Sequence, residues 1–341
     1  MALEQTVLND KIVAHLLFEN YGITFVSMEK LNLGSANCFR VYDGNKYYFL
    51  KEFQSSFSEN AVIQEAKLLE YLSASGISTT RFFTTRKKEF VVNYKNHMIC
   101  LEEYIEGQTY GYDNLPFELL PKVGGMLGRL HHALKDYPLP VNMSDKWLDS
   151  FSAENMITQY DSLIEIAESK ADDKNTNIII RDLQYKKQLA YRCEEYKKYY
   201  NGVTYCSTHG DYQGCQLIFD KNEIKAVIDF SVASCLPVTW EIMRSFVQSS
   251  NYCTTVDINA FCEYVREYLK FSPLTKTDMI AMPYVYLFQL ARSQYGYKQY
   301  LISESEDREQ LLRFAFWRTK MCQEVEKNAE AISNALIKLI D

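Results

Sequence analysis

The most informative segment of the sequence spans residues 204–230 and reads TYCSTHGDYQGCQLIFDKNEIKAVIDF. It begins with a short apolar segment and continues through a loop that carries His209, Gly210 and Asp211. Two apolar runs follow, separated by the polar residues 220–223. Apolar runs on either side of a polar turn of this length predict a β-hairpin.

One register of this hairpin brings oxygen-bearing side chains together. If Phe219 pairs with Ala226, then Gln216 lies opposite Asp229, and opposed residues of antiparallel strands point to the same face. Asp211 comes a few residues before Gln216, so its side chain can reach the same space. Phosphoryl transfer from a nucleotide needs an acid that orients the acceptor hydroxyl and oxygen ligands for a hard cation. Asp211 can serve as the acid, and the amide oxygen of Gln216 and the carboxylate of Asp229 can serve as the ligands.

The His-Gly-Asp loop, the amide residue after it and the hairpin that ends in Ile-Asp-Phe resemble the aminoglycoside phosphotransferase family. This family of kinase-like small-molecule phosphotransferases is related to choline and homoserine kinases. The resemblance extends to the Thr-Trp-Glu-Ile segment at 239–242 and, more weakly, into the first hundred residues. It implies an α+β, bilobal protein-kinase-like fold, with a small N-terminal lobe of antiparallel sheet plus one helix and a larger, mainly helical C-terminal lobe.

Length and charge set limits on the class of protein. A chain of 341 residues is long enough for two lobes with a core in each. The 37 basic and 44 acidic residues give a net charge of −7. This balance argues against nucleic acid as the main partner and is compatible with a cationic substrate.

The cysteines and the N-terminus indicate a cellular location. Nine scattered cysteines, without a Cys-x-x-Cys pair, predict neither a disulfide framework nor a zinc site and fit a reducing compartment. The N-terminal residues have no basic start followed by an apolar core, and no stretch approaches the ~20 apolar residues of a membrane span. We therefore expect a cytoplasmic protein that does not bind membranes.

In the first hundred residues, apolar side chains recur at the spacings typical of strands and helices. After a predicted helix at 9–18, the turn Asp43-Gly44-Asn45 separates the alternating runs CFRVY and YYFLK, which predicts a second hairpin with Lys51 on its returning strand. An apolar stripe at helical spacing predicts a helix over 59–74, with Glu65 beside the stripe. The resemblance implies that Lys51 holds the α- and β-phosphates of the nucleotide and that Glu65 orients it.

The resemblance also implies contacts for the rest of the nucleotide. The turn at 34–37, which includes Ser35, is expected to cover the phosphates with backbone N–H groups. The runs KEFVVNY and HMICLEEYIEG predict two more strands. By position, Glu102, Glu103 and Tyr104 are expected to form the segment whose backbone binds the adenine.

The lobe boundary is expected near Glu106, which gives an N-terminal nucleotide-binding lobe at 1–105 and a C-terminal catalytic and substrate-binding lobe at 106–341. Helical spacing of apolar residues predicts a buried helix within 116–138, with His131 and His132 in it. Adjacent histidines do not share a helix face, so we interpret both as structural.

The resemblance implies further roles after the hairpin. Trp240 and Glu241 are expected to open a helix that braces the catalytic loop, and Glu241 and Arg244 are spaced to pair along it. Asp211 is expected to orient the acceptor hydroxyl and accept its proton. Gln216 and Asp229 are the predicted ligands of Mg²⁺.

Two departures from the family pattern affect the metal site. Gln216 stands where most members have asparagine, which places its amide one methylene further from the backbone. Ser231 stands where many relatives have a second acid. The number of metal ions, one or two, therefore stays open, since Mg²⁺ demands ligand oxygens at about 2.0–2.1 Å in octahedral array.

The expected reaction is transfer of the γ-phosphate of ATP or GTP to a hydroxyl of a small molecule. An aminoglycoside-type antibiotic is the first candidate acceptor, because the resemblance points there and an acidic protein tolerates a cation. Choline, homoserine or a sugar is the alternative within the same chemistry. A kinase-like binding protein without transfer activity is the alternative outside it, and the chain is expected to be a monomer or homodimer.

Overall fold

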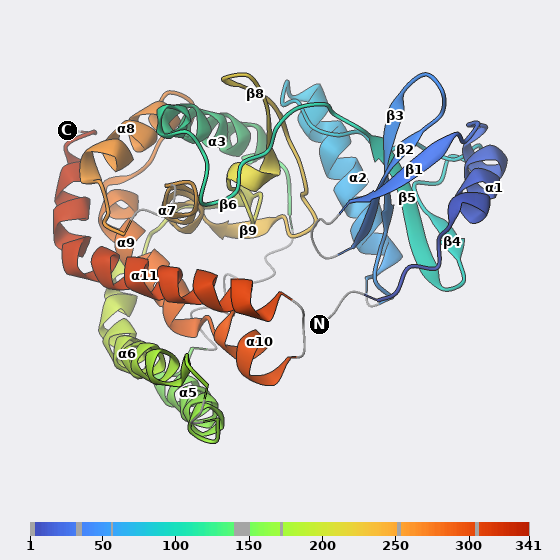
Figure 1. Ribbon diagram of the computed structural model, residues 1–341. Coiled ribbons are helices and arrows are strands. Elements are labelled where there is room, and N and C mark those ends of the chain that lie inside the picture. Colours follow the sequence, from blue (N-terminus) through green and yellow to red (C-terminus); the bar gives the residue numbers. More distant parts are fainter. Residues whose placement is uncertain are drawn as a thin grey trace. The chain divides into compact units, whose positions relative to one another are not determined.

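The computed structural model describes residues 4–31, 36–55, 57–139, 151–170, 173–250, 254–303 and 307–340. The chain forms two compact units (Figure 1). The first unit combines Met1–Gln108 with Leu217–Ser231, and the second combines Thr109–Gln216 with Val232–Asp341. The hairpin predicted within 204–230 therefore belongs to the first unit, although part of the second unit precedes it in the sequence.

The first unit is built on an antiparallel five-stranded sheet in the order β1-β2-β3-β5-β4. Its strands follow the predicted pattern, and the Asp43-Gly44-Asn45 turn joins two of them. The elements are α1 (Asp10–Tyr21), β1 (Ser27–Leu31), β2 (Asn37–Tyr42), β3 (Tyr47–Glu52), α2 (Glu59–Ala74), β4 (Val92–Tyr94) and β5 (His97–Glu103).

The two faces of this sheet have different roles. Because side chains alternate along a strand, Phe39, Leu50 and Leu101 lie on one face, where they form an apolar core with α1. Lys51 and Glu102 lie on the opposite face. Figure 1 shows α1 and α2 on opposite sides of the sheet. The face without the α1 core thus carries the charged side chains.

Helix α2 spans the predicted residues. It begins after Ser58, whose hydroxyl accepts a hydrogen bond from the Ala61 N–H, as an N-terminal cap does. Gly76 follows its end in the left-handed region, with φ of 79°. Glu65 is buried in the helix together with its apolar stripe.

The hairpin of β7 (Leu217–Asp220) and β8 (Glu223–Val227) forms as predicted, but its predicted register is wrong by one residue. Ile218, rather than Phe219, pairs with Ala226. The chain reverses in a two-residue turn at Lys221 and Asn222, where Lys221 has φ of 55°, and Asp220 therefore pairs with Glu223. A bulge between Ile218 and Phe219 changes the pairing along the hairpin, since Phe219 lies opposite Ile224 while Ile218 lies opposite Ala226.

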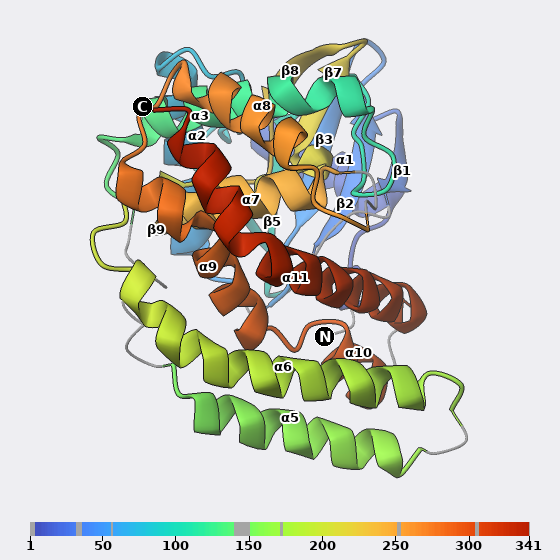
Figure 2. The same ribbon diagram turned by 90° about the vertical axis from the view of Figure 1, so that its left-hand side faces the viewer.

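The second unit is mainly helical, with a two-stranded antiparallel sheet of β6 and β9. In Figure 2, α5 and α6 lie side by side as a helical hairpin, and α11 lies over α9. The elements are η1 (Phe117–Leu119), α3 (Leu120–Leu134), α5 (Ala153–Glu168), α6 (Thr176–Tyr196), η2 (Lys197–Tyr199), β6 (Tyr205–Thr208), η3 (Gly214–Gln216), β9 (Ser234–Pro237), α7 (Val238–Gln248), α8 (Ile258–Leu269), α9 (Lys276–Arg292), α10 (Tyr297–Ile302) and α11 (Arg308–Ile337).

Close packing of α3 against α8 depends on glycine. A Cβ atom at Gly124 would lie 2.4 Å from the Tyr264 carbonyl oxygen, and one at Gly128 would lie 2.4 Å from that of Tyr268. The two helices can therefore approach backbone to backbone, which brings His131 of α3 to the centre of the unit. Within the described ranges, no helix has both the length and the apolar character to cross a membrane.

Candidate active site

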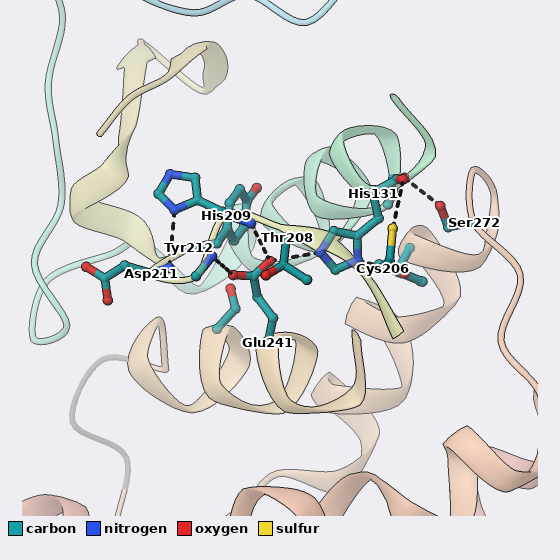
Figure 3. A network of polar contacts seen from close by, with 12 residues as sticks. His131, Cys206, Thr208, His209, Asp211, Tyr212, Glu241 and Ser272 are labelled. Carbon is teal, nitrogen blue, oxygen red and sulfur yellow. Dashed lines mark hydrogen bonds and ion pairs between the residues drawn. The ribbon is translucent and has the colours of Figure 1, made fainter. Parts of the chain in front are cut away.

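The His209-Gly210-Asp211 loop follows β6 and is fixed by a buried carboxylate of α7. Glu241 Oε2 accepts a hydrogen bond from the His209 N–H at 3.1 Å, and Oε1 accepts one from the Gly210 N–H at 2.6 Å (Figure 3). Gly210 has φ of 83°, and a Cβ atom there would lie 2.3 Å from the Val232 carbonyl oxygen. The loop conformation thus requires glycine at this position and an acceptor at 241.

Glu241 is held in turn by His131. His131 Nε2 lies 2.8 Å from Glu241 Oε2, and Nδ1 lies 2.9 Å from the Tyr268 hydroxyl oxygen. Burial alone would raise the pKa of Glu241, but its hydrogen bond to His131, the nearby histidine charges and the Gly210 N–H lower it overall. The expected brace is therefore present, and its acid is a stable anion. His131 is buried and structural, as predicted, while His132 is exposed.

Asp211 lies at the end of this loop with its side chain 31% exposed. Its carboxylate forms an ion pair with Arg244 of α7 and accepts a hydrogen bond from Gln216 Nε2 at 3.1 Å. Gln213 Nε2 donates to the same oxygen at 3.3 Å. The structure thus brings Asp211 and Gln216 together, as expected, through the short η3 turn rather than through the strand.

The predicted pairing of Glu241 with Arg244 is wrong. Glu241 points into the buried loop, where two backbone N–H groups and His131 use its oxygens, whereas Arg244 is partly exposed and reaches Asp211. The contact between Arg244 and Asp211 was not predicted, because Glu241, three residues before Arg244 on the same helix, is an apparent partner for the arginine. Asp211 and Arg244 are 33 residues apart in the sequence, and no local pattern reports a contact over that separation.

In the first unit, Lys51 of β3 is surrounded by carboxylates. Its Nζ lies 3.6 Å from Asp229 Oδ1, and its side chain is 12% exposed. Burial alone would lower the pKa of Lys51, but the negative charges of Glu65, Glu102 and Asp229 raise it overall. The lysine is therefore a firmly held cation, and the structure brings Lys51, Glu65 and Asp229 of the predicted set into one cluster.

Two buried carboxylates, Glu65 and Glu102, act on this cation through their charge. Burial raises the pKa of Glu65 to about 7 against the opposing effect of Lys51. Burial also raises the pKa of Glu102, again opposed by Lys51, and Glu102 accepts a hydrogen bond from the Thr80 hydroxyl at 3.0 Å. From the sequence, only the backbone of Glu102 was predicted to have a role, in binding the adenine. Strand alternation, which places it on the face of Lys51, was the signal for its side chain.

The remaining predicted residues differ in how far the structure describes them. Glu103 pairs with Tyr48 in the sheet, and its N–H donates to the Arg81 carbonyl oxygen at 2.8 Å. Tyr104 follows the end of β5, and its ring lies 5.9 Å from that of Tyr47. Gly34 and Ser35 of the turn at 34–37 lie outside the described residues. The adenine and phosphate contacts stay predictions.

The chemistry of two residues fits a hard cation. Asp229 has φ of 62°, and its side chain is 39% exposed, so a carboxylate oxygen is accessible. The Ser231 hydroxyl donates to Oδ1 of this carboxylate at 2.9 Å, as a group that orients a metal ligand would. Gln216 supplies an amide oxygen, since its nitrogen is directed to Asp211. Carboxylate and amide oxygens are suitable ligands for Mg²⁺.

Comparison with known sequences gave one family match. The model of the phosphotransferase enzyme family matches residues 28–280, which include β1 to β9 and both clusters described above. No curated protein sequence matched the chain.

Solved structures with a similar fold include small-molecule kinases. A spectinomycin phosphotransferase, in complex with ADP and spectinomycin, is 15% identical with a TM-score of 0.69, covering 95% of this chain and 99% of that one. An amicoumacin kinase with AMP-PNP, Ca²⁺ and Ami is 14% identical, with a TM-score of 0.62 and coverage of 92% and 93%. A choline kinase from Cryptosporidium parvum Iowa II is 16% identical, with a TM-score of 0.56 and coverage of 98% and 100%. These likenesses confirm the kinase-like α+β fold.

Proposed function

Because the chain belongs to the phosphotransferase enzyme family, we propose that it transfers the γ-phosphate of ATP or GTP to a hydroxyl group of a small molecule. Family membership confirms the predicted class of enzyme, a small-molecule kinase. The observation that carries the proposal is the loop that holds Asp211. Its backbone is fixed by a buried anion, while the carboxylate of Asp211 itself stays partly exposed.

Asp211 orients the acceptor in this reaction. Its carboxylate accepts a hydrogen bond from the acceptor hydroxyl, and the hydroxyl oxygen attacks the γ-phosphorus. A bond forms from that oxygen to phosphorus, the bond from phosphorus to the β-phosphate oxygen breaks, and the nucleoside diphosphate leaves with the electron pair. A carboxylate is a weak base toward an alcohol, so Asp211 acts mainly by alignment and receives the proton late.

The nucleotide is assigned to the cluster around Lys51. Lys51, held by the charges of Glu65 and Glu102, offsets phosphate charge. Asp229 and Gln216 are the proposed oxygen ligands for Mg²⁺, which would neutralise charge on the phosphates. Support comes from the similar structures, one of which holds ADP and another AMP-PNP with Ca²⁺.

The acceptor is the least defined part of the proposal. An aminoglycoside-type antibiotic is the first candidate from the sequence, and choline, homoserine or a sugar is the alternative. The similar structures include kinases named for spectinomycin, amicoumacin and choline, so the fold serves several acceptors. A cytoplasmic location and a monomeric or homodimeric state likewise stay predictions.

The test is transfer of labelled phosphate from γ-labelled ATP and GTP, with Mg²⁺, to a panel of aminoglycosides, amino alcohols, sugars and hydroxy amino acids. We expect one class of acceptor to gain the label and EDTA to abolish transfer. Nucleotide binding without transfer to any acceptor would contradict the proposal and favour a binding protein.

A further inference from the structure

The open end of the hairpin formed by β2 and β3 is closed by an N-terminal segment, residues 4–7, which we call the N-terminal clasp. The first and last paired residues of this hairpin are Asn37 and Glu52. The Glu4 carbonyl oxygen accepts a hydrogen bond from Asn37 Nδ2 at 3.0 Å. The Val7 N–H donates a hydrogen bond to Glu52 Oε1, also at 3.0 Å. One short segment therefore contacts both strands at the point where the hairpin opens.

Glu4 makes most of the hydrogen bonds of the clasp. Its N–H donates to Gln54 Oε1 at 2.7 Å, two residues after the end of β3. Its carboxylate accepts hydrogen bonds from the Ser55 N–H at 2.9 Å and from the Ser55 hydroxyl at 2.5 Å. These bonds from Ser55 lower the pKa of Glu4, so an anion binds both donors at neutral pH. The two residues are 51 positions apart, which makes the clasp a tertiary contact.

The clasp is anchored at its other end by helix α1 and the core beneath it. Leu8, which follows the clasp directly, is buried in the apolar core of the sheet and α1, and Val7 packs against the same core. Asn9 then caps α1, since its side-chain oxygen accepts a hydrogen bond from the Ile12 N–H at 3.0 Å. The clasp is therefore held between a packed helix and the two strand ends that it joins.

The strand ends that the clasp joins lie next to Lys51. Lys51 directly precedes Glu52, and it pairs with Cys38, which directly follows Asn37. Because side chains alternate along a strand, those of Asn37 and Glu52 lie on the face of the α1 core, opposite the face of Lys51. The contacts of the clasp with Asn37 and Glu52 are thus made on the face opposite Lys51, and they act on Lys51 through the backbone of both strands.

We propose that Glu4 is a positioning residue of the nucleotide site, which fixes the backbone on both sides of Lys51 from the opposite face of the sheet. This inference rests on the proposed function, in which Lys51 offsets phosphate charge. A lysine binds phosphate through charge-assisted hydrogen bonds, whose strength depends on distance and angle. Without the clasp the open end of the hairpin can fray, and Lys51 then has no single position. Binding of the phosphate groups should therefore weaken, while binding of the nucleoside should not.

The test compares ligands that share the nucleoside and differ in their phosphates. Titration calorimetry measures the binding of ATP and ADP with Mg²⁺, and of adenosine, to the full chain and to Glu4→Ala. Gln5→Ala, which changes an exposed neighbour within the clasp, is the matched control. Ser55→Ala removes a single donor to Glu4 and tests the same contact if Glu4→Ala does not fold. Urea denaturation gives the stability of each variant, and steady-state kinetics give its kcat and KM values.

We expect Glu4→Ala to weaken the binding of ATP and ADP by about 3- to 10-fold, and Ser55→Ala to weaken it less. The KM for ATP should rise in the same proportion, while kcat, the KM for the acceptor and the affinity for adenosine stay unchanged. Gln5→Ala should behave as the wild type.

Equal ATP affinity of Glu4→Ala and the wild type, with or without a loss of stability, would overturn the inference and leave the kinase proposal intact. The same loss of affinity for adenosine as for ATP would also overturn it, because the whole site would then be distorted. A wild type that binds none of the three ligands would contradict the proposed function, and the role of Glu4 with it.

Discussion

The two units each bury a charged cluster, and the clusters differ in how completely their charges are satisfied. In the second unit, Glu241 is an anion with a lowered pKa, held by two backbone N–H groups and His131. In the first unit, Glu65 and Glu102 have raised pKa values and share Lys51. All three of these carboxylates are buried, so burial alone does not explain why the pKa of Glu241 is lowered, and the hydrogen bonds that Glu241 accepts make the difference.

This contrast suggests different roles for the two clusters, one in holding the loop of Asp211 and the other in binding a ligand. A fully satisfied buried anion holds the loop of Asp211 in a single conformation and has no capacity left for a ligand. A lysine shared by carboxylates that do not all stay ionised can exchange its partners for phosphate at little cost. We therefore propose that the Glu241 cluster positions the loop and that the Lys51 cluster binds the nucleotide.

Replacement of Glu241 should have the largest effect. Glu241→Ala leaves two loop N–H groups and His131 without their acceptor, so we expect a loss of about 3–5 kcal/mol in the free energy of unfolding. Urea denaturation measures it. Glu330→Ala, at an exposed site on α11, should change stability by less than about 0.5 kcal/mol. Equal stability of the two variants would contradict the role of Glu241.

Replacement of Gly210 should come next. Gly210→Ala combines left-handed strain with a contact to the Val232 backbone, which together should destabilise the protein by about 2–4 kcal/mol and reduce transfer. Gly76 has a similar φ of 79° but open space around it. Gly76→Ala should therefore lose about 1–2 kcal/mol, from strain alone. If the two variants lose the same amount by urea denaturation, the close contact at Gly210 has no importance.

Replacement of Glu65 should have a smaller, pH-dependent effect. Its folded pKa of about 7 lies above the unfolded value, so the folded protein binds the extra proton between these values. The stabilisation from the protonated form is present below the unfolded pKa and is lost as pH rises toward 7, by up to about 1.4 kcal/mol per pH unit. When the pH is raised from 5 to 7.5, the free energy of unfolding should therefore fall less in Glu65→Gln than in the wild type.

The matched control for this pH effect is Glu70→Gln, at an exposed position of the same helix, which should follow the wild-type pH dependence. Unfolding in urea at both pH values gives the comparison. A Glu65→Gln variant with the full wild-type pH dependence would show that Glu65 is ionised like an ordinary carboxylate. The cluster around Lys51 would then be as fully satisfied as that of Glu241.

Much of the fold was predictable because local signals were strong. Alternating runs around Asp43-Gly44-Asn45 gave the hairpin of Lys51, and the apolar stripe gave α2 with its bounds. The hairpin after Asp211 was found, but its register was not. A left-handed Lys221 and a bulge at Ile218 are single-residue features that leave no trace in a pattern of apolar and polar residues.

The candidate site was predictable only in part, for a similar reason. Motif and order along the chain identified Lys51, Glu65 and Asp211, since they follow recognisable elements. The side chain of Glu102 was missed, and Arg244 was given the wrong partner, because the groups that they contact lie far away in the sequence. Contacts with side chains distant in the sequence determine the roles of Glu102 and Arg244. The spacing of apolar and polar residues along the chain does not reveal such contacts.

The central claim is that Asp211 serves transfer while the cluster around Lys51 serves nucleotide binding, and the Asp211→Asn variant tests it most directly. Nucleotide affinity is measured by calorimetry, and transfer of labelled phosphate to the preferred acceptor is measured on the same sample. We expect unchanged nucleotide affinity with transfer reduced by about 10²- to 10⁴-fold. Transfer at the wild-type rate, or a loss of nucleotide binding equal to the loss of transfer, would contradict the claim.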